Sequence, residues 1–122
     1  MPQKVLIVDD EPNIVTSLTF LMKKSGFETS IARDGDEALS EVERFGPDLV
    51  LLDVMMPKRD GFEVCQTLRA AGHTQLKIVF LTAKGRETEV AKGLAIGADS
   101  YVTKPFSTRE LVDLVNQLLA GG

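Results

Sequence analysis

Short apolar runs alternate with longer amphipathic segments along the whole of this sequence. The apolar runs are four or five residues long and nearly uninterrupted, which is typical of strands buried on both faces of a parallel sheet. They predict strands at residues 4–8, 27–32, 49–53, 78–82 and 100–103. Each run is followed by a segment whose apolar residues recur every three or four positions, which predicts a helix. The pattern therefore predicts five strand–helix units.

The helical segments are marked by apolar stripes and by residues that begin or end helices. Pro12 suits a first helical turn, and Gly26 and Gly46 suit helix ends. Ser107 and Glu110 form a capping box at the start of the last helix. The apolar stripes are Ile14, Leu18, Leu21 and Met22; Ala38, Leu39 and Val42; Phe62, Cys65 and Leu68; Val90, Leu94 and Ala95; and Leu111, Val112, Val115, Leu118 and Leu119.

Parallel strands in one sheet are joined by right-handed crossovers, so five strand–helix units close into an open sheet with helices on both faces. The sequence thus predicts an α/β fold, a doubly wound five-stranded parallel sheet. Its 122 residues suit one domain over residues 1–122 and suffice for a real core.

Composition narrows the class of protein. Hydrophobic residues make up 43% of the chain and charged residues 26%, as in ordinary globular domains. No apolar run approaches the roughly 20 residues of a membrane-spanning helix, so we expect no membrane partner. The net charge is −4 without a basic cluster, which argues against direct nucleic-acid binding. Cys65 is the single cysteine, and the lack of an internal disulfide fits a cytoplasmic location.

Polar residues follow four of the predicted strands. Asp9 and Asp10 follow the first strand and Asp53 ends the third; Thr82 and Lys104 come at the ends of the fourth and fifth. In the strand order 2-1-3-4-5, the first and third strands are neighbours. Ligands of such sheets bind at the carboxyl ends of the strands. We therefore expect three carboxylates, one hydroxyl and one ammonium at a single edge.

Three carboxylates at one edge repel each other by roughly 3 kcal/mol per pair at about 5 Å and an effective dielectric near 20. Oxygen ligands without a nearby histidine or thiolate favour a hard cation, and Mg²⁺ commonly combines one or two carboxylates with phosphate oxygens. A carboxylate is also able to attack phosphorus. Asp53 is the best candidate nucleophile, and Asp9 and Asp10 are better placed as metal ligands. Lys104 would offset charge on the transferred group.

Each of these residues also has an ordinary structural interpretation. Asp10 suits the N-cap of the first helix, and Asp60-Gly61 is an ordinary turn signal. Met55 is a packing candidate, although its backbone carbonyl is two residues from Asp53 and within reach of a metal. His73 is expected to be solvated in its loop.

Five sequence blocks resemble the receiver domains of two-component response regulators, the CheY-like superfamily. The blocks are LIVDDE at residues 6–11, DVMMPKRDG at 53–61, FLTA at 80–83, GAD at 97–99 and YVTKPF at 101–106. Any one of them is weak evidence, but five in order at these spacings are specific. The resemblance covers essentially the whole chain.

The resemblance implies a phosphoryl-accepting site. Asp53 would be the phosphoacceptor, charged by the phosphohistidine of a sensor histidine kinase. Mg²⁺ would be bound by Asp10, Asp53 and the Met55 carbonyl, with Asp9 acting through water. Lys104 would contact the phosphoryl group, and the peptide bond that follows it would be cis.

The resemblance also implies a signalling switch in place of a conventional enzyme. Thr82 would move toward the phosphoryl group, and the Tyr101 ring would turn inward behind it. The output surface would be the face made by the fourth helix, fifth strand and fifth helix, which passes the signal to an effector domain or a downstream protein. The same face would form a homodimer in which Asp99, Arg109 and Lys92 take part, with Asp113 as an unfavourable charge.

Three alternatives stay open at this point. A phosphatase of the haloacid dehalogenase type would also use an aspartate nucleophile with Mg²⁺, but it needs a second aspartate where this chain has Met55. A flavodoxin-like carrier needs a loop rich in Ser, Thr and Gly after the first strand, where this chain has Asp9 and Asp10. The third alternative is that the chain is the receiver part of a longer transcriptional response regulator.

Overall fold

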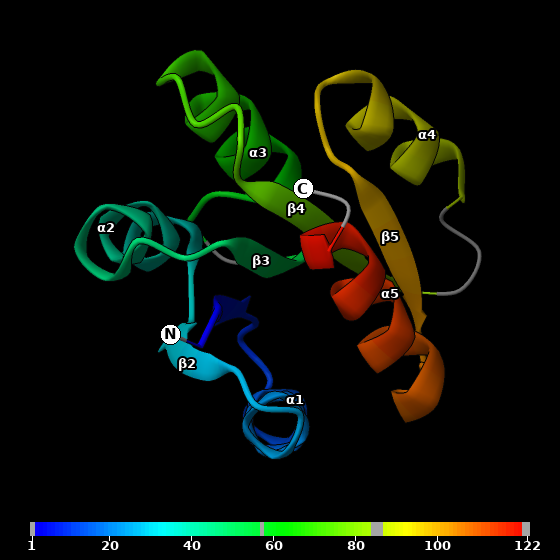
Figure 1. Ribbon diagram of the computed structural model, residues 1–122. Coiled ribbons are helices and arrows are strands. Elements are labelled where there is room, and N and C mark those ends of the chain that lie inside the picture. The colour runs from blue at the N-terminus through cyan, green and yellow to red at the C-terminus, as the bar shows by residue number, and fades with distance from the viewer. Residues whose placement is uncertain (1, 57, 84–86, 121–122) are drawn as a thin grey trace.

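Five strands and five helices alternate in the computed structural model, which describes residues 2–56, 58–83 and 87–120 (Figure 1). The strands form one parallel sheet in the order β2-β1-β3-β4-β5, which confirms the predicted fold class and strand order. The elements are β1 (Lys4–Val8), α1 (Pro12–Lys24), β2 (Glu28–Ala32), α2 (Gly35–Phe45), β3 (Leu49–Asp53), α3 (Gly61–Ala70), β4 (Lys77–Ala83), α4 (Glu87–Ala95), β5 (Ser100–Lys104) and α5 (Thr108–Ala120).

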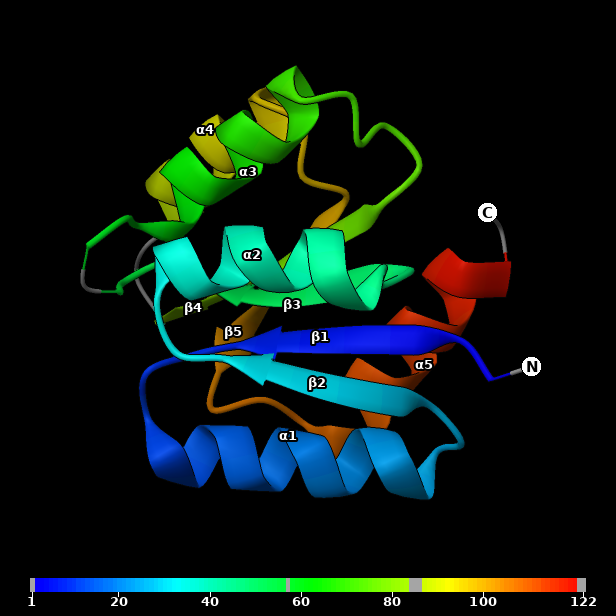
Figure 2. The ribbon, with the colours of Figure 1, turned by 90° about the vertical axis from the view of Figure 1, so that its left-hand side faces the viewer.

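The helices form two layers around the sheet. Figure 2 shows α2, α3 and α4 on one side of the strands and α1 and α5 on the other. Successive strand residues face opposite sides, so Leu6 packs with α2 and α3 while Ile7 packs with α1 and α5. The central strands are therefore covered on both faces, as their uninterrupted apolar runs predict. Both ends of the described chain lie at one end of the sheet, opposite the carboxyl ends of the strands (Figure 2).

Most element boundaries lie within two residues of their predicted positions. The fourth strand is longer than predicted and runs from Lys77 to Ala83. Helix α1 begins at Pro12, and α2 ends before Gly46, whose φ of 65° is in the left-handed region that favours glycine. The Ser107 hydroxyl accepts a hydrogen bond from the Glu110 N–H at 3.3 Å, as the capping box predicts. Among the described residues, no helix combines the length and the apolar character needed to cross a membrane.

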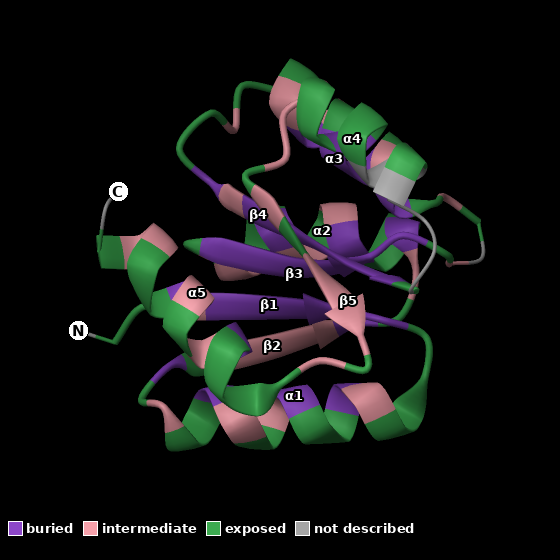
Figure 3. Ribbon diagram, turned by 90° about the vertical axis from the view of Figure 1, so that its right-hand side faces the viewer, coloured by how far each residue is buried: buried purple, intermediate pink, exposed green. Residues whose placement is uncertain are grey.

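The predicted stripe of the fourth helix is wrong. Leu94 is 37% exposed and Ala95 is exposed, whereas Gly93 is buried. The side chain of Val90, the third residue of the predicted stripe, lies outside the described residues. A Cβ on Gly93 would lie 2.3 Å from Cε2 of Phe80 and 2.8 Å from Cε1 of Phe62. Among the residues of α4 whose burial is described, Gly93 is thus the one buried against the core, and the others are exposed (Figure 3).

Candidate functional site

The carboxyl ends of four strands meet at one edge of the sheet and bring the predicted polar residues together. Asp53 ends β3 and pairs in register with Leu81, the residue before Thr82. Lys104 ends β5 and pairs with Ala83, the residue after Thr82. Asp9 follows β1, the neighbour of β3 on its other side. The strand order therefore places the four residues side by side.

Three carboxyl groups gather at this edge. Asp9, Asp10 and Asp53 each offer an oxygen, and these oxygens lie within 4.8 Å of one another. Asp9 is fully buried and Asp53 is 5% exposed, whereas Asp10 is exposed. Buried acids without a matching positive charge are costly, so this cluster needs a cation or a retained proton.

Lys104 supplies one positive charge to the cluster. Its Nζ lies 2.8 Å from Asp9 Oδ2, 3.6 Å from Asp53 Oδ1 and 3.5 Å from Glu11 Oε1. Burial opposes the ammonium charge, but the hydrogen bond to Asp9 and the nearby carboxylates together raise the pKa of Lys104 above its usual value. The Glu11 contact was not predicted, because its exposed side chain reaches the edge from the first residues after β1.

Within the described residues, one lysine contacts the cluster of three acids, and its charge does not balance theirs. Burial is the main cause that raises the pKa of Asp53 to about 7, and the charge on Asp9 adds to it. Lys104 and a hydrogen bond from the Met55 N–H act in the opposite direction. Without a further cation, the carboxyl group of Asp53 therefore keeps its proton to a higher pH than an ordinary aspartate does.

Backbone groups orient two of the acids. The Glu11 N–H donates to Asp9 Oδ1 at 2.9 Å, and the Met55 N–H donates to Asp53 Oδ1 at 3.3 Å. Asp10 is not the N-cap of α1: that position is held by Glu11, which makes no side-chain cap. The N-cap interpretation of Asp10 is therefore wrong, and its carboxylate belongs with the acidic cluster.

The donors at this edge fit a hard divalent cation. They are carboxylate oxygens from Asp9, Asp10 and Asp53, and no thiol or imidazole is among them in the described cluster. Mg²⁺ prefers such ligands. Burial and the charge on Asp9 raise the pKa of Asp53 despite the nearby Lys104, and a bound cation would oppose both effects.

Thr82 and Tyr101 lie on neighbouring strands at different depths. Thr82 is 3% exposed, and among the described residues its hydroxyl has one long contact, 3.5 Å to the Ala83 carbonyl oxygen. Tyr101 is 39% exposed and pairs in register with Phe80, two residues before Thr82. The peptide bond between Lys104 and Pro105 is cis, as the resemblance implies.

Two predicted loop features are corrected by the structure. Asp60 is more than a turn residue, because its Oδ1 caps α3 by accepting from the Glu63 N–H at 2.9 Å. His73 is not simply solvated: its Nε2 lies 2.8 Å from Glu43 Oε1, and its side chain is 29% exposed.

Asp99 has a partner that was not predicted. Its Oδ2 accepts hydrogen bonds from Arg69 Nη2 at 3.0 Å and from the Ile78 N–H at 2.8 Å. The same guanidinium donates to the carbonyl oxygens of Gly97, His73 and Leu76. The carboxylate that we expected in a dimer contact is thus already bound within the chain.

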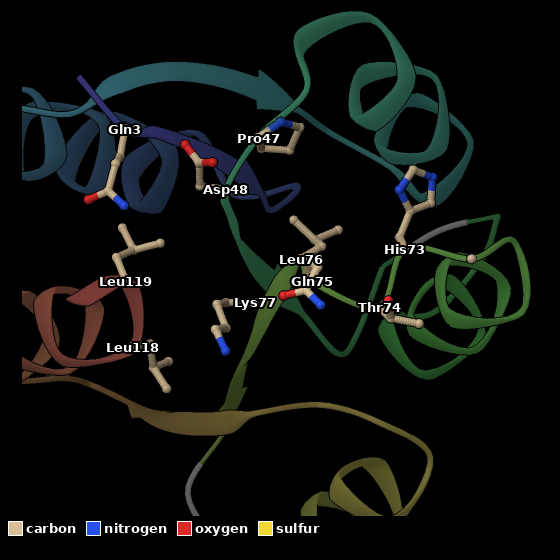
Figure 4. Close-up of a pocket in the computed structure, with 11 residues that line it drawn as sticks. Gln3, Pro47, Asp48, His73, Thr74, Gln75, Leu76, Lys77, Leu118 and Leu119 are labelled. Atoms are coloured by element: carbon tan, nitrogen blue, oxygen red, sulfur yellow. The ribbon is translucent and has the colours of Figure 1, made fainter. Parts of the chain in front are cut away.

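A pocket lies at the opposite end of the sheet (Figure 4). It is lined by the residues before and at the start of β3 and β4, among them Asp48 and Lys77, and by Leu118 and Leu119 at the end of α5. None of the acidic cluster, Thr82 or Lys104 lines it. The predicted chemistry is therefore at an open edge of the sheet and outside this pocket.

Comparisons with known proteins identify the family to which the chain belongs. Residues 5–116 match the family model described as the response regulator receiver domain. The chain is 48% identical over 119 residues to the alkaline phosphatase synthesis transcriptional regulatory protein PhoP of Bacillus subtilis, covering 98% of this chain and 49% of that protein. It is 45% identical to the sensory transduction protein RegX3 of Mycolicibacterium smegmatis, covering 97% of this chain and 51% of that protein.

A solved receiver domain has the same fold as this chain. The Francisella response regulator 1452 receiver domain is 34% identical and superposes with a TM-score of 0.90, covering 97% of each chain. The chain spans about half the length of the curated relatives that it matches. The family match over residues 5–116 shows that the chain belongs to the receiver domain family of two-component response regulators and is a signalling switch.

Proposed function

We propose that Asp53 accepts a phosphoryl group from the phosphohistidine of a sensor histidine kinase. In this step a carboxylate oxygen of Asp53 attacks phosphorus, the bond from phosphorus to the imidazole nitrogen breaks, and the nitrogen keeps the electron pair. The observation that supports it most is the position of Asp53, a 5%-exposed acid at the end of β3, beside Lys104 and within 4.8 Å of the other two acids. The chain would be its own phosphoryl acceptor and would have no separate substrate to turn over.

Asp10, Asp53 and the Met55 carbonyl would hold Mg²⁺, with Asp9 acting through water. When bound, this ion would supply the positive charge that keeps Asp53 ionised and offsets charge on the phosphoryl oxygens. Lys104 is already within 3.6 Å of Asp53 Oδ1 and would contact the bound phosphoryl group. Its hydrogen bond to Asp9 holds the ammonium at the edge of the sheet.

The phosphoryl group would change the output face through Thr82 and Tyr101. Phosphorylation adds roughly 1.5 to 2 negative charges and new acceptor oxygens. The buried Thr82 hydroxyl, whose contact to the Ala83 carbonyl oxygen is long at 3.5 Å, would donate to one of them. Movement of this hydroxyl would open space for the half-exposed Tyr101 ring and alter the α4–β5–α5 face.

The partners follow from the family and from the relatives' length. Receivers obtain their phosphoryl group from sensor kinases, so we propose a cytoplasmic site of action beside such a kinase. The curated relatives are about twice as long as this chain, and PhoP is a transcriptional regulatory protein. An effector domain is therefore the proposed recipient of the signal. A homodimer through α4–β5–α5 would use Arg109 and Lys92, since Asp99 is bound to Arg69.

Intact mass after incubation with acetyl phosphate and MgCl₂ tests the phosphoacceptor. We expect a gain of one phosphoryl group in the wild-type protein, no gain in Asp53→Asn, and a much smaller gain in EDTA. Asp48→Asn is the matched control, because Asp48 precedes the same strand at its other end; it should be phosphorylated normally. An unchanged gain in Asp53→Asn would show that another residue is the acceptor.

A further inference from the structure

The segment between β3 and α3, described at residues 54–56 and 58–60, is bound to the helices on both sides of it. Arg59 Nε lies 2.7 Å from Asp36 Oδ1 on α2, and Arg59 Nη1 lies 3.0 Å from Glu63 Oε2 on α3. Lys58 Nζ adds a contact of 3.5 Å to Asp34 Oδ2, the N-cap residue of α2. The guanidinium of Arg59 therefore joins the segment to α2 and α3 at once.

Close backbone packing accompanies these ion pairs. A Cβ on Gly35 would lie 2.4 Å from Arg59 Cβ and 2.8 Å from the Arg59 carbonyl oxygen. The φ of Gly35 is not in the left-handed region, so the glycine is needed here for space. The first turn of α2 thus lies directly against Arg59.

The other support of the segment is at Asp53 itself. The Gly61 N–H donates to the Val54 carbonyl oxygen at 2.9 Å, and a Cβ on Gly61 would lie 2.5 Å from the Asp53 carbonyl oxygen. Within the segment, the Met55 N–H donates to Asp53 Oδ1 at 3.3 Å. A shift of the segment would therefore move a donor that contacts the reacting carboxylate.

We propose that Arg59 is a positioning residue for phosphoryl transfer at Asp53. By binding Asp36 and Glu63, it fixes the segment whose Met55 N–H donates to Asp53 Oδ1. This inference rests on the proposed role of Asp53. Exposed ion pairs contribute little to global stability, whereas small displacements at a reacting centre have large effects on rate. The effect of Arg59 should therefore be visible at the site and almost absent from the melting temperature.

Mg²⁺ binding to the unphosphorylated protein, measured by titration calorimetry, provides the first test. If charge alone mattered, loss of the positive charge of Arg59 would tighten Mg²⁺ binding and loss of the negative charge of Asp36 would weaken it. If Arg59 and Asp36 act by position, both Arg59→Gln and Asp36→Asn should raise the dissociation constant, by about three- to fivefold. The double variant should bind Mg²⁺ no more weakly than the single variant with the higher dissociation constant, because each single substitution already breaks the ion pair between Arg59 and Asp36.

The initial rate of phosphorylation by acetyl phosphate provides the second test. We expect Arg59→Gln to lower it by about three- to fivefold and Arg59→Lys, which keeps one ion pair, to restore part of the loss. The matched control is Arg44→Gln, which breaks a comparable arginine pair with Glu41 on α2, away from the segment. It should leave both measurements unchanged.

The outcomes separate this inference from the proposed function. If wild-type protein is not phosphorylated on Asp53, the proposed function fails. If wild-type protein is phosphorylated but Arg59→Gln matches Arg44→Gln, or binds Mg²⁺ more tightly than wild type, the positioning role is overturned. Loss of the melting transition in Arg59→Gln would also overturn it, because the residue would then be needed for folding.

Discussion

Asp53 is a buried acid beside Asp9, and both its burial and the charge on Asp9 shift the pH at which it titrates. Its pKa is raised to about 7, whereas an unfolded aspartate titrates near 3.8. Between these values the folded state binds more protons than the unfolded state. The free energy of unfolding should therefore be highest at low pH within this window, fall as the pH rises toward about 7, and level off above it.

Urea unfolding in EDTA from pH 5 to pH 8.5 checks this expectation. The wild-type protein should lose about 2–4 kcal/mol across the window, since each unit of pKa shift corresponds to about 1.4 kcal/mol. Asp53→Asn should remove most of this slope and should be more stable than wild type at pH 8. Glu28→Gln, which changes an exposed acid at the start of β2, is the control and should keep the wild-type slope. If Asp53→Asn were less stable than wild type at pH 8, crowding of the acids at this edge would not be what destabilises the folded protein.

For single residues, the sequence predicted which residues lie at the strand ends better than it predicted which side chains contact them. Asp9, Asp53, Thr82 and Lys104 were predicted because a parallel sheet brings its carboxyl ends together. Contacts made by long side chains from loops and helices have no such regularity. The Glu11 contact to Lys104 and the bonds of Arg69 to Asp99 are therefore visible only in three dimensions.

Among the elements, α4 is the one whose packing the sequence pattern failed to predict. A helix normally packs through an apolar stripe, and the sequence offered Val90, Leu94 and Ala95. Gly93 instead lies against the edge-to-face pair of Phe62 and Phe80, whose ring centroids are 5.2 Å apart. Hydrophobic periodicity does not detect a contact that depends on the absence of a side chain. The strands were predicted well because β1, β3 and β4 are buried on both faces.

Gly93→Ala tests how closely α4 packs. Alanine is favoured over glycine in a helix by about 1 kcal/mol, but forcing an extra methyl group into a packed site costs about 1–3 kcal/mol. Since the new Cβ would lie 2.3 Å from Phe80 Cε2, we expect a net loss of about 1–2 kcal/mol in urea unfolding. In a Phe80→Leu background the same change should cost less, because the crowded ring is gone. Stabilisation by Gly93→Ala in the wild-type background would show that α4 has room to move.

For the whole molecule, the acidic edge couples cation binding to folding. A ligand that binds only the folded state stabilises it by about 1.4 kcal/mol when its concentration is tenfold above the dissociation constant. The three acids are brought within 4.8 Å only by folding, so Mg²⁺ should bind the folded state preferentially.

Thermal unfolding with MgCl₂ and with NaCl of equal ionic strength checks this coupling. We expect MgCl₂ to raise the melting temperature of the wild-type protein by a few degrees. The rise should be smaller in Asp10→Asn, because this variant lacks one of the three carboxylates that would bind the ion. Equal shifts in the two salts would mean that general screening is responsible.

The two ends of the described chain lie at the same end of the sheet, remote from the acidic edge (Figure 2). A biotin or affinity handle attached at either terminus would hold the molecule on a sensor surface with Asp53 turned toward the solution. The same arrangement allows a fluorescent protein to be fused at either end without shielding the acids from a kinase. Immobilised and tagged forms should therefore report phosphotransfer as the free protein does.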